Sequence, residues 1–190
     1  MDLKFLAIQE SSLKGDAVSS SNAVGYWQFK EPVANEFGLR VDRQVDERRH
    51  IFRSSQGAAN YFKKANEDFD NYIYAVIAYY EGLTGAIPYT NPDYYGKRKM
   101  IVDENLHWYV MKAIAHKLAY KDALGMDHTP RVWLEPAVVE RGTSLSDLSN
   151  KHSIEAGVLL EYNPWILDER RLPSTPFTYY IPRFDAPYPG

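Results

Sequence analysis

The uneven placement of proline limits where long helices can form in this chain of 190 residues. Eight of its 11 prolines lie in the last third, at positions 130, 136, 164, 173, 176, 182, 187 and 189. Proline removes a backbone donor and disrupts helix interiors, so long helices are confined to the first 125 or so residues. The segment GMDHTP at 125–130 is typical of a helix end followed by a linker. We therefore predict two units, residues 1–127 and residues 128–190.

The spacing of apolar residues predicts an all-α first unit. Helices are expected at 3–10, 32–38, 53–68, 71–81 and about 103–122. The polar segment 40–50 (RVDRQVDERRH) is expected to be irregular. Its RRH cluster at 48–50, and the KRK cluster at 97–99, are interpreted as solvated faces.

The second unit is predicted to be small and mixed. RVWLEPAVV at 131–139 and FTYYIP at 177–182 indicate strands, and 144–151 and 154–162 indicate helices. The order is thus strand, helix, helix, strand. A core this small is marginal alone, so the unit is expected to pack against the helical one. The residues expected to face the sheet are Leu145, Leu148, Val158, Leu159 and Leu160.

Composition excludes several classes of function. Hydrophobic residues make up 45% and charged residues 25%, as in folded soluble proteins. The net charge of -3 gives no electrostatic case for binding nucleic acid or an anionic membrane. No apolar run is long enough for a membrane span. The chain has no cysteine, and its histidines show no metal-ligand spacing, so we expect no metal and no cofactor. We also expect a monomer.

Glu10 is the first candidate for chemistry. In a helix over residues 3–10, Leu3, Leu6 and Glu10 share one face, which places a carboxyl at the end of an apolar stripe. Burial there would raise the pKa of Glu10, as a general acid working near neutral pH requires. A helix-end acid can equally be a solvated surface residue. The turn 25–28 (GYWQ) follows at a distance that one loop can span.

Four short motifs occur in an informative order: Glu10-Ser11, Gly25-Tyr26-Trp27-Gln28, Ala78-Tyr79-Tyr80 and Tyr109-Val110. In this order they resemble the lytic transglycosylase domain of the soluble and membrane-bound D type, which has a goose-lysozyme-like core. The resemblance implies a mainly α, lysozyme-like first unit that cleaves peptidoglycan between N-acetylmuramic acid and N-acetylglucosamine. It also implies that Glu10 acts first as acid and then as base, while a 1,6-anhydro ring closes on the muramyl product.

The resemblance also assigns residues that contact substrate or support the acid. Ser11 would orient Glu10 or only hold the helix end, and the Gln28 amide suits an acetamido group. Gly25 would permit a tight turn beside the sugar. An aromatic such as Trp27 is more often a core residue, whereas Tyr79 and Tyr109 could equally lie in the core or around the catalytic acid. Tyr94 and Tyr95 are expected to line a groove. The complete substrate-binding set is Ser11, Gly25, Trp27, Gln28, Tyr79, Tyr80 and Tyr109.

Two features leave the activity open. Tyr80 stands where the family has asparagine, so substrate preference or rate could differ, and a silent peptidoglycan-binding protein is one alternative. A hydrolytic lysozyme or chitinase is another, although such enzymes use two carboxylates. Asp16 and Glu81 are the candidates for a second acid, with a turn residue and a solvated helix-end carboxylate as the simpler interpretations.

The segment 142–166 and the closing PFTYYIP resemble a diverged LysM repeat, which is also β-α-α-β. Gly142-Thr143-Ser144-Leu145 lacks the usual aspartate, whereas Asn163-Pro164 fits. The resemblance implies either binding of N-acetylglucosamine chains or a bracing role. It also implies the bacterial cell envelope, in the periplasm or at the outer membrane. Because Met1 leads directly into the first helix, we expect a targeting signal to have been trimmed upstream.

Overall fold

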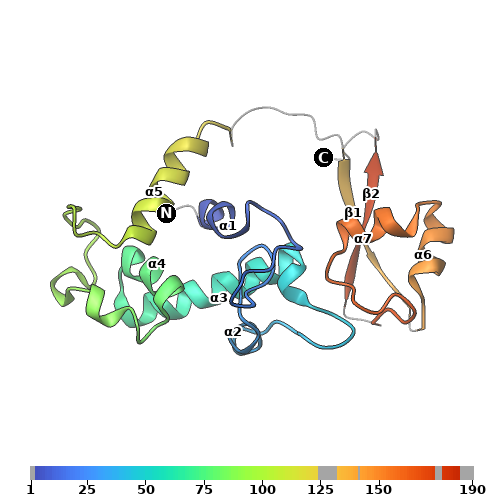
Figure 1. Cartoon of the computed structure of the whole chain (residues 1–190), viewed down its shortest axis with the longest axis horizontal. Coiled ribbons are helices and arrows are strands. Elements are labelled where there is room, and N and C mark those ends of the chain that lie inside the picture. The colour runs from blue at the N-terminus through green and yellow to red at the C-terminus, as the bar shows by residue number, and fades with distance from the viewer. Residues whose placement is uncertain (1–2, 124–131, 141, 174–176, 185–190) are drawn as a thin grey trace.

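The computed structural model describes residues 3–123, 132–140, 142–173 and 177–184. Figure 1 shows one group of helices at one end of the molecule and a sheet with its own helices at the other. The boundary predicted near residue 128 lies outside the described residues. The helical elements of the first part are α1 (Lys4–Ser11), α2 (Glu31–Glu36), η1 (Glu47–Arg49), α3 (Ile51–Phe69), α4 (Tyr72–Glu81), η2 (Ile87–Tyr89), η3 (Pro92–Tyr94) and α5 (Trp108–Tyr120).

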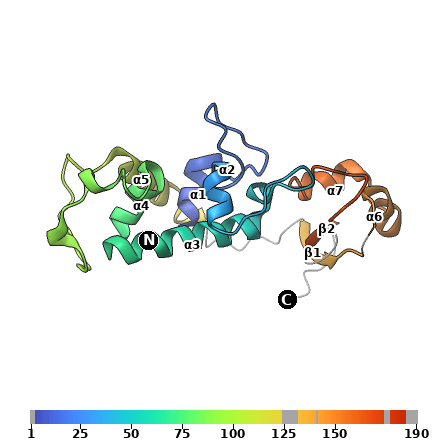
Figure 2. The same ribbon diagram turned by 90° about the horizontal axis from the view of Figure 1, so that it is seen from below.

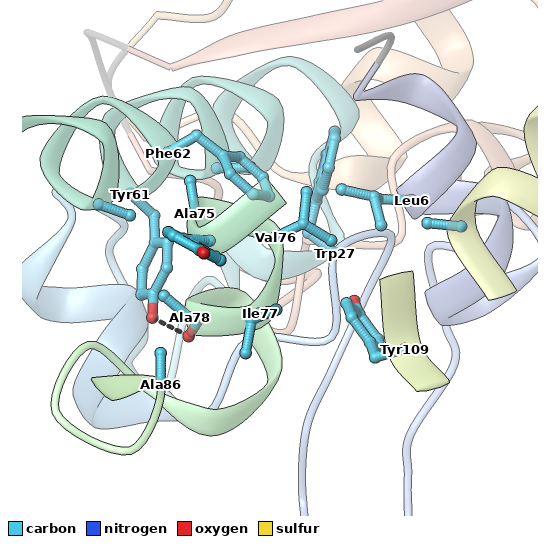
Figure 3. Packing of buried hydrophobic residues seen from close by; sticks show 14 of the residues in the cluster. Leu6, Trp27, Tyr61, Phe62, Ala75, Val76, Ile77, Ala78, Ala86 and Tyr109 are labelled. Carbon is cyan, nitrogen blue, oxygen red and sulfur yellow. Dashed lines mark hydrogen bonds between the residues drawn. The ribbon is translucent and has the colours of Figure 1, made fainter. Parts of the chain in front are cut away.

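The core of the helical part lies around α4. This helix is apolar on most sides, and its residues 74–78 are all buried. It packs against the amphipathic α3, whose Tyr61 hydroxyl donates to the carbonyl of Ala78 (Figure 3). Phe62 stacks on Tyr79, with ring centroids 4.7 Å apart. The apolar spacing in the sequence therefore predicted both helices correctly, because one face of each had to be buried.

Helix α5 begins at Trp108, so the prediction that it starts near residue 103 is wrong. Residues 103–106 form a turn, in which the Asp103 side chain accepts the backbone N–H of Asn105. His107 then caps the helix, because its ring accepts the backbone N–H of Tyr109. A local side chain–backbone bond of this kind competes with helix formation, and apolar spacing does not reveal it.

The second part has the predicted β-α-α-β order, with β1 (Val132–Val138), α6 (Leu145–His152), α7 (Ala156–Tyr162) and β2 (Thr178–Phe184). The strands pair antiparallel, with Val132 opposite Phe184 and Val138 opposite Thr178. Ser144 and Asp147 form a capping box at the start of α6. Leu145, Leu148 and Leu159 are buried in the core of this part, as expected, and Leu160 packs partly buried against it. Val158 is half-buried and does not belong to this core, which differs from the prediction.

The segment 40–50 joins the two parts. Val45 forms a β-bridge with Ile166 and belongs to the core of the second part. The backbone N–H of Asp46 donates to the carbonyl of Trp165 over 3.0 Å. Figure 1 shows this loop reaching from the helices toward the sheet, and Figure 2 shows the second part beyond the N-terminal end of α3. The expected packing of the small unit against the helical one is thus observed.

The RRH cluster at 48–50 is not a solvated face, and that prediction is wrong. Arg48 is buried and forms a two-pronged ion pair with the buried Asp46, with both N–O distances 2.8 Å. His50 is buried between Trp165 and Tyr180. Burial lowers the pKa of His50 from its ordinary value, so the ring is neutral in this apolar contact. The charges of Arg48 and Asp46 are tolerated at this buried junction because they pair with each other.

Candidate active site

A cavity of about 620 Å³ opens between α1, the loop before α2, and the ends of α4 and α5. Its size is in the range of ligand-binding pockets. Its floor carries aromatic side chains from three helices, Tyr61, Tyr79 and Tyr109. The polar side chains that line it are Glu10, Ser19, Ser21, Gln28, Lys30 and Glu81.

Glu10 lies at the edge of the helical core. It sits in the last turn of α1, one turn after the fully buried Leu6, so the apolar stripe brings its carboxyl into the cavity. The Tyr109 hydroxyl donates to Oε1 of Glu10. Burial raises the pKa of Glu10, and the Tyr109 hydrogen bond and the nearby Lys112 offset only part of that rise. The site therefore holds a carboxyl that keeps its proton to higher pH than an exposed one.

Tyr109 is the hydrogen-bond donor to the Glu10 carboxyl. It is 2% exposed and belongs to the same core as Leu6 and Trp27 (Figure 3). Burial and the negative charge of Glu10 both raise the pKa of Tyr109. The phenol thus stays protonated and donates its hydrogen to the Glu10 carboxylate.

Tyr109→Phe is expected to raise the pKa of Glu10 further, because the charged form of the acid loses a hydrogen bond. The lost bond is expected to lower the free energy of unfolding by about 1 kcal/mol. Carbon-13 NMR of the Glu10 carboxyl carbon measures the titration directly. Tyr79→Phe is the matched control, because the Tyr79 hydroxyl donates to the Trp27 carbonyl instead, over 2.7 Å. An unchanged titration in Tyr109→Phe would contradict this account.

The turn at Gly25 positions Gln28, which lines the cavity. Gly25 has a φ of +82°, and a Cβ there would lie 1.8 Å from the carbonyl oxygen of Arg48. Only glycine fits this close approach. Gln28, also at positive φ, donates its amide hydrogens to the carbonyls of Gly25 and Ala17. Since both amide hydrogens are held by the loop, Oε1 is the atom that Gln28 can offer to a ligand in the cavity.

Three of the predicted substrate-binding residues lie outside the cavity lining, namely Gly25, Ser11 and Trp27. The Ser11 hydroxyl is buried and donates toward the carbonyls of Ala7 and Tyr26, so it ties α1 to the turn. The Trp27 side chain is 6% exposed and donates to the Ser55 hydroxyl inside the core. Tyr79 lines the cavity, but its hydroxyl is engaged by the Trp27 carbonyl. Ser11 and Trp27 therefore support the site from outside the cavity.

Tyr80 lies at the mouth of the cavity. Its side chain is 52% exposed and stacks on Tyr109, with ring centroids 5.0 Å apart and planes at 27°. Trp108, which is also exposed, meets Tyr80 edge-on with centroids 4.8 Å apart. Tyr80 therefore leaves Glu10 accessible and adds an aromatic surface beside it.

The other polar residues that line the cavity carry only weak signals in the sequence. Ser19 and Ser21 come from the serine-rich loop, and Lys30 precedes α2, where each resembles an ordinary loop residue. Glu81 is half-buried rather than solvated as expected, and it lies 3.1 Å from Nε2 of His107. Asp16 does not line the cavity, and its backbone carbonyl accepts a hydrogen bond from Arg49.

The expected groove tyrosines divide between two environments. Tyr94 lines a second cavity of about 530 Å³, which also contains Tyr89 and His107. Tyr95 packs edge-on against Phe69 and Tyr74 instead. Within the described ranges, no cluster of three or more histidine, aspartate or glutamate side chains is placed to hold a metal ion. No helix among those residues is long and apolar enough to cross a bilayer.

Comparison with known proteins identifies the family of the chain. Residues 1–99 match the family described as the transglycosylase SLT domain, and the chain belongs to this family. Over 83 residues, 43% of the chain, it is 35% identical to the membrane-bound lytic murein transglycosylase D of Escherichia coli K12. The protein of the same name from Escherichia coli O6:H1 strain CFT073 is equally similar. The match covers 18% of the length of each relative.

Proposed function

We propose that the protein is a peptidoglycan lytic transglycosylase with Glu10 as its single acid and base. The observation that carries this proposal is the environment of the Glu10 carboxyl. This carboxyl lines the cavity, has a raised pKa because it is buried, and accepts a hydrogen bond from the Tyr109 hydroxyl. Membership of the SLT family supports it. The substrate would be the glycan strand, cleaved at the β-1,4 bond between N-acetylmuramic acid and N-acetylglucosamine.

The proposed reaction uses Glu10 twice. The protonated carboxyl gives its proton to the glycosidic oxygen as the bond breaks, which a raised pKa favours. The carboxylate that results then takes the proton of the muramyl 6-hydroxyl as that oxygen closes the 1,6-anhydro ring. Tyr109 stabilises the carboxylate between the two steps by donating to Oε1. The Gln28 Oε1 atom can accept an N–H of an acetamido group in the cavity.

The mass of the product tests the proposal. Purified protein incubated with sacculi is expected to release muropeptides that end in 1,6-anhydromuramic acid, as measured by mass spectrometry. Hydrolysis would instead leave a reducing-end sugar heavier by one water. The absence of any anhydro product from active protein would contradict transglycosylation.

The hydrolytic alternative is favoured by one observation, the position of Glu81. Glycosidases that add water use a second carboxylate as base or nucleophile. Glu81 lines the same cavity as Glu10. We prefer the single-acid reaction, because the Glu81 carboxylate already accepts a hydrogen bond from His107. A reducing-end product would select the alternative.

A silent binding protein is the other alternative, and Tyr80 is the residue that motivates it. Its ring would have to cover Glu10 for this to hold, yet the carboxyl still lines the cavity. Retained binding to sacculi without turnover would select this alternative.

For the second part, we propose a diverged LysM-like repeat that braces the helical part, on the grounds of its β-α-α-β order and its contacts with segment 40–50. Sites of action in the bacterial cell envelope follow from the proposed substrate.

A further inference from the structure

The pair formed by Glu81 and His107 takes no part in the chemistry above, although Glu81 shares a cavity with Glu10. Glu81 is the last residue of α4, and His107 immediately precedes α5. Their side chains meet at 3.1 Å between Nε2 and Oε1, and the His107 side chain is 5% exposed. His107 also lines the second cavity, so the pair stands between the two cavities.

The contacts of His107 fix the position of its ring proton. Nδ1 lies 3.3 Å from the backbone nitrogen of Tyr109 and accepts its N–H, so Nδ1 carries a lone pair. The proton of the neutral ring is therefore on Nε2, where Glu81 accepts it. Tyr89 packs edge-on against the ring, with centroids 4.8 Å apart, and holds it in this orientation.

The ring of His107 is also the cap of α5. Tyr109 is the second residue of that helix, so its N–H has no acceptor within the helix. The side chain of the same tyrosine donates to Glu10. A continuous series of contacts thus runs from Glu81 through His107 and Tyr109 to Glu10.

We propose that Glu81 and His107 are positioning residues, which hold the Tyr109 hydroxyl against Glu10 by fixing the cap of α5. The inference rests on the proposed function, because it assigns their role within the same acid site. Neither residue touches the reacting atoms. Glu81 acts as a hydrogen-bond acceptor, and its charge is not what the site requires.

Two roles for Glu81 predict opposite changes in the pKa of Glu10. If Glu81 were only a nearby negative charge, its removal would lower that pKa. If Glu81 positions Tyr109, its removal takes a donor away from the Glu10 carboxylate and raises that pKa. The other titratable groups that face Glu10 or share its cavity stay unchanged in the test, namely Lys112 and Tyr109 on α5, Tyr79 and Tyr80 on α4, Tyr61 on α3 and Lys30 before α2.

The experiment follows the Glu10 carboxyl by carbon-13 NMR titration of the full chain and measures turnover of purified peptidoglycan in parallel. Glu81→Ala is expected to move the Glu10 titration to higher pH and to lower kcat about tenfold, with KM little changed. Glu81→Gln keeps an acceptor for Nε2 without the charge. It is therefore expected to titrate like the wild type and to keep most of the turnover.

Two further variants complete the test. Glu67→Ala removes an exposed carboxylate from α3 and is expected to change neither readout. His107→Asn places a strong capping residue before α5, so it is expected to retain the Tyr109 contact and to make Glu81→Ala silent in that background.

Two results would overturn the positioning role. One is a lowered pKa of Glu10 in Glu81→Ala, and the other is a Glu81→Gln variant as impaired as Glu81→Ala. If the wild type fails to cleave peptidoglycan, the proposed function fails, whereas the NMR titration still decides whether Glu81 and His107 position Tyr109.

Discussion

Glu10→Gln is expected to lower the turnover of peptidoglycan by about 10³-fold, because the proposed reaction relies on one proton-transferring group. Glutamine has nearly the shape of the protonated acid, and its Oε1 can still accept from the Tyr109 hydroxyl. It has no proton to give to the leaving oxygen. Release of anhydromuropeptides over time measures the loss, and sedimentation with sacculi measures whether binding is kept.

The same variant is expected to be as stable as the wild type or more stable, which separates lost chemistry from lost folding. Because the folded-state pKa of Glu10 is raised, its contribution to stability is fully present below the ordinary carboxyl pKa. That contribution is lost as the pH rises through the raised value. At neutral pH, Glu10→Gln is therefore expected to gain about 1 kcal/mol in free energy of unfolding, and the gain should vanish in acid.

Retention of turnover within about tenfold of the wild type would remove Glu10 from the role of acid. The remaining carboxylate among the described cavity residues is Glu81. A combined Glu10→Gln and Glu81→Gln variant would then show whether Glu81 had supplied the proton.

The fold followed from the sequence wherever burial imposed a period. Helices α3 and α4 each bury one or more faces, so their apolar residues recur at helical spacing. The start of α5 did not follow, because the His107 cap depends on a ring orientation fixed by Glu81 and Tyr89. The burial of the charged cluster at 48–50 did not follow either, for a related reason. Its charges are paired across the chain, and a linear pattern of charge does not show which partners are buried.

The candidate site was predictable at the acid and less so around it. Glu10 lies at the end of a buried stripe, which the spacing of Leu6 before it indicated. The resemblance assigns Trp27 to the substrate-binding set, but the core position that an aromatic residue more often takes is the one observed. Ser19, Ser21 and Lys30 reach the cavity only because the loop folds back through the bridges of Val24 with Val18 and Phe29.

Asp46→Ala is expected to cost about 3–5 kcal/mol in free energy of unfolding, because it leaves a buried guanidinium without its carboxylate. The side chains of Arg48 and Asp46 are 9% and 6% exposed. Once Asp46 is truncated, the contact that remains to Arg48 is a 3.3 Å hydrogen bond to the carbonyl of Phe29. The midpoint of urea unfolding, at constant slope, measures the change.

A double variant separates the burial of charge from the loss of packing. Arg48→Met in the Asp46→Ala background removes the unpaired charge, so it is expected to recover a large part of the lost stability. Asp68→Ala breaks the exposed ion pair with Lys64 on α3 and is expected to cost less than about 0.5 kcal/mol. A cost below about 1 kcal/mol for Asp46→Ala would mean that water reaches Arg48. The backbone carbonyl of Arg48 lies against Gly25, so the pair supports the turn at 25–28. The backbone N–H of Asp46 donates to the carbonyl of Trp165, so the same pair supports the contact with the second part.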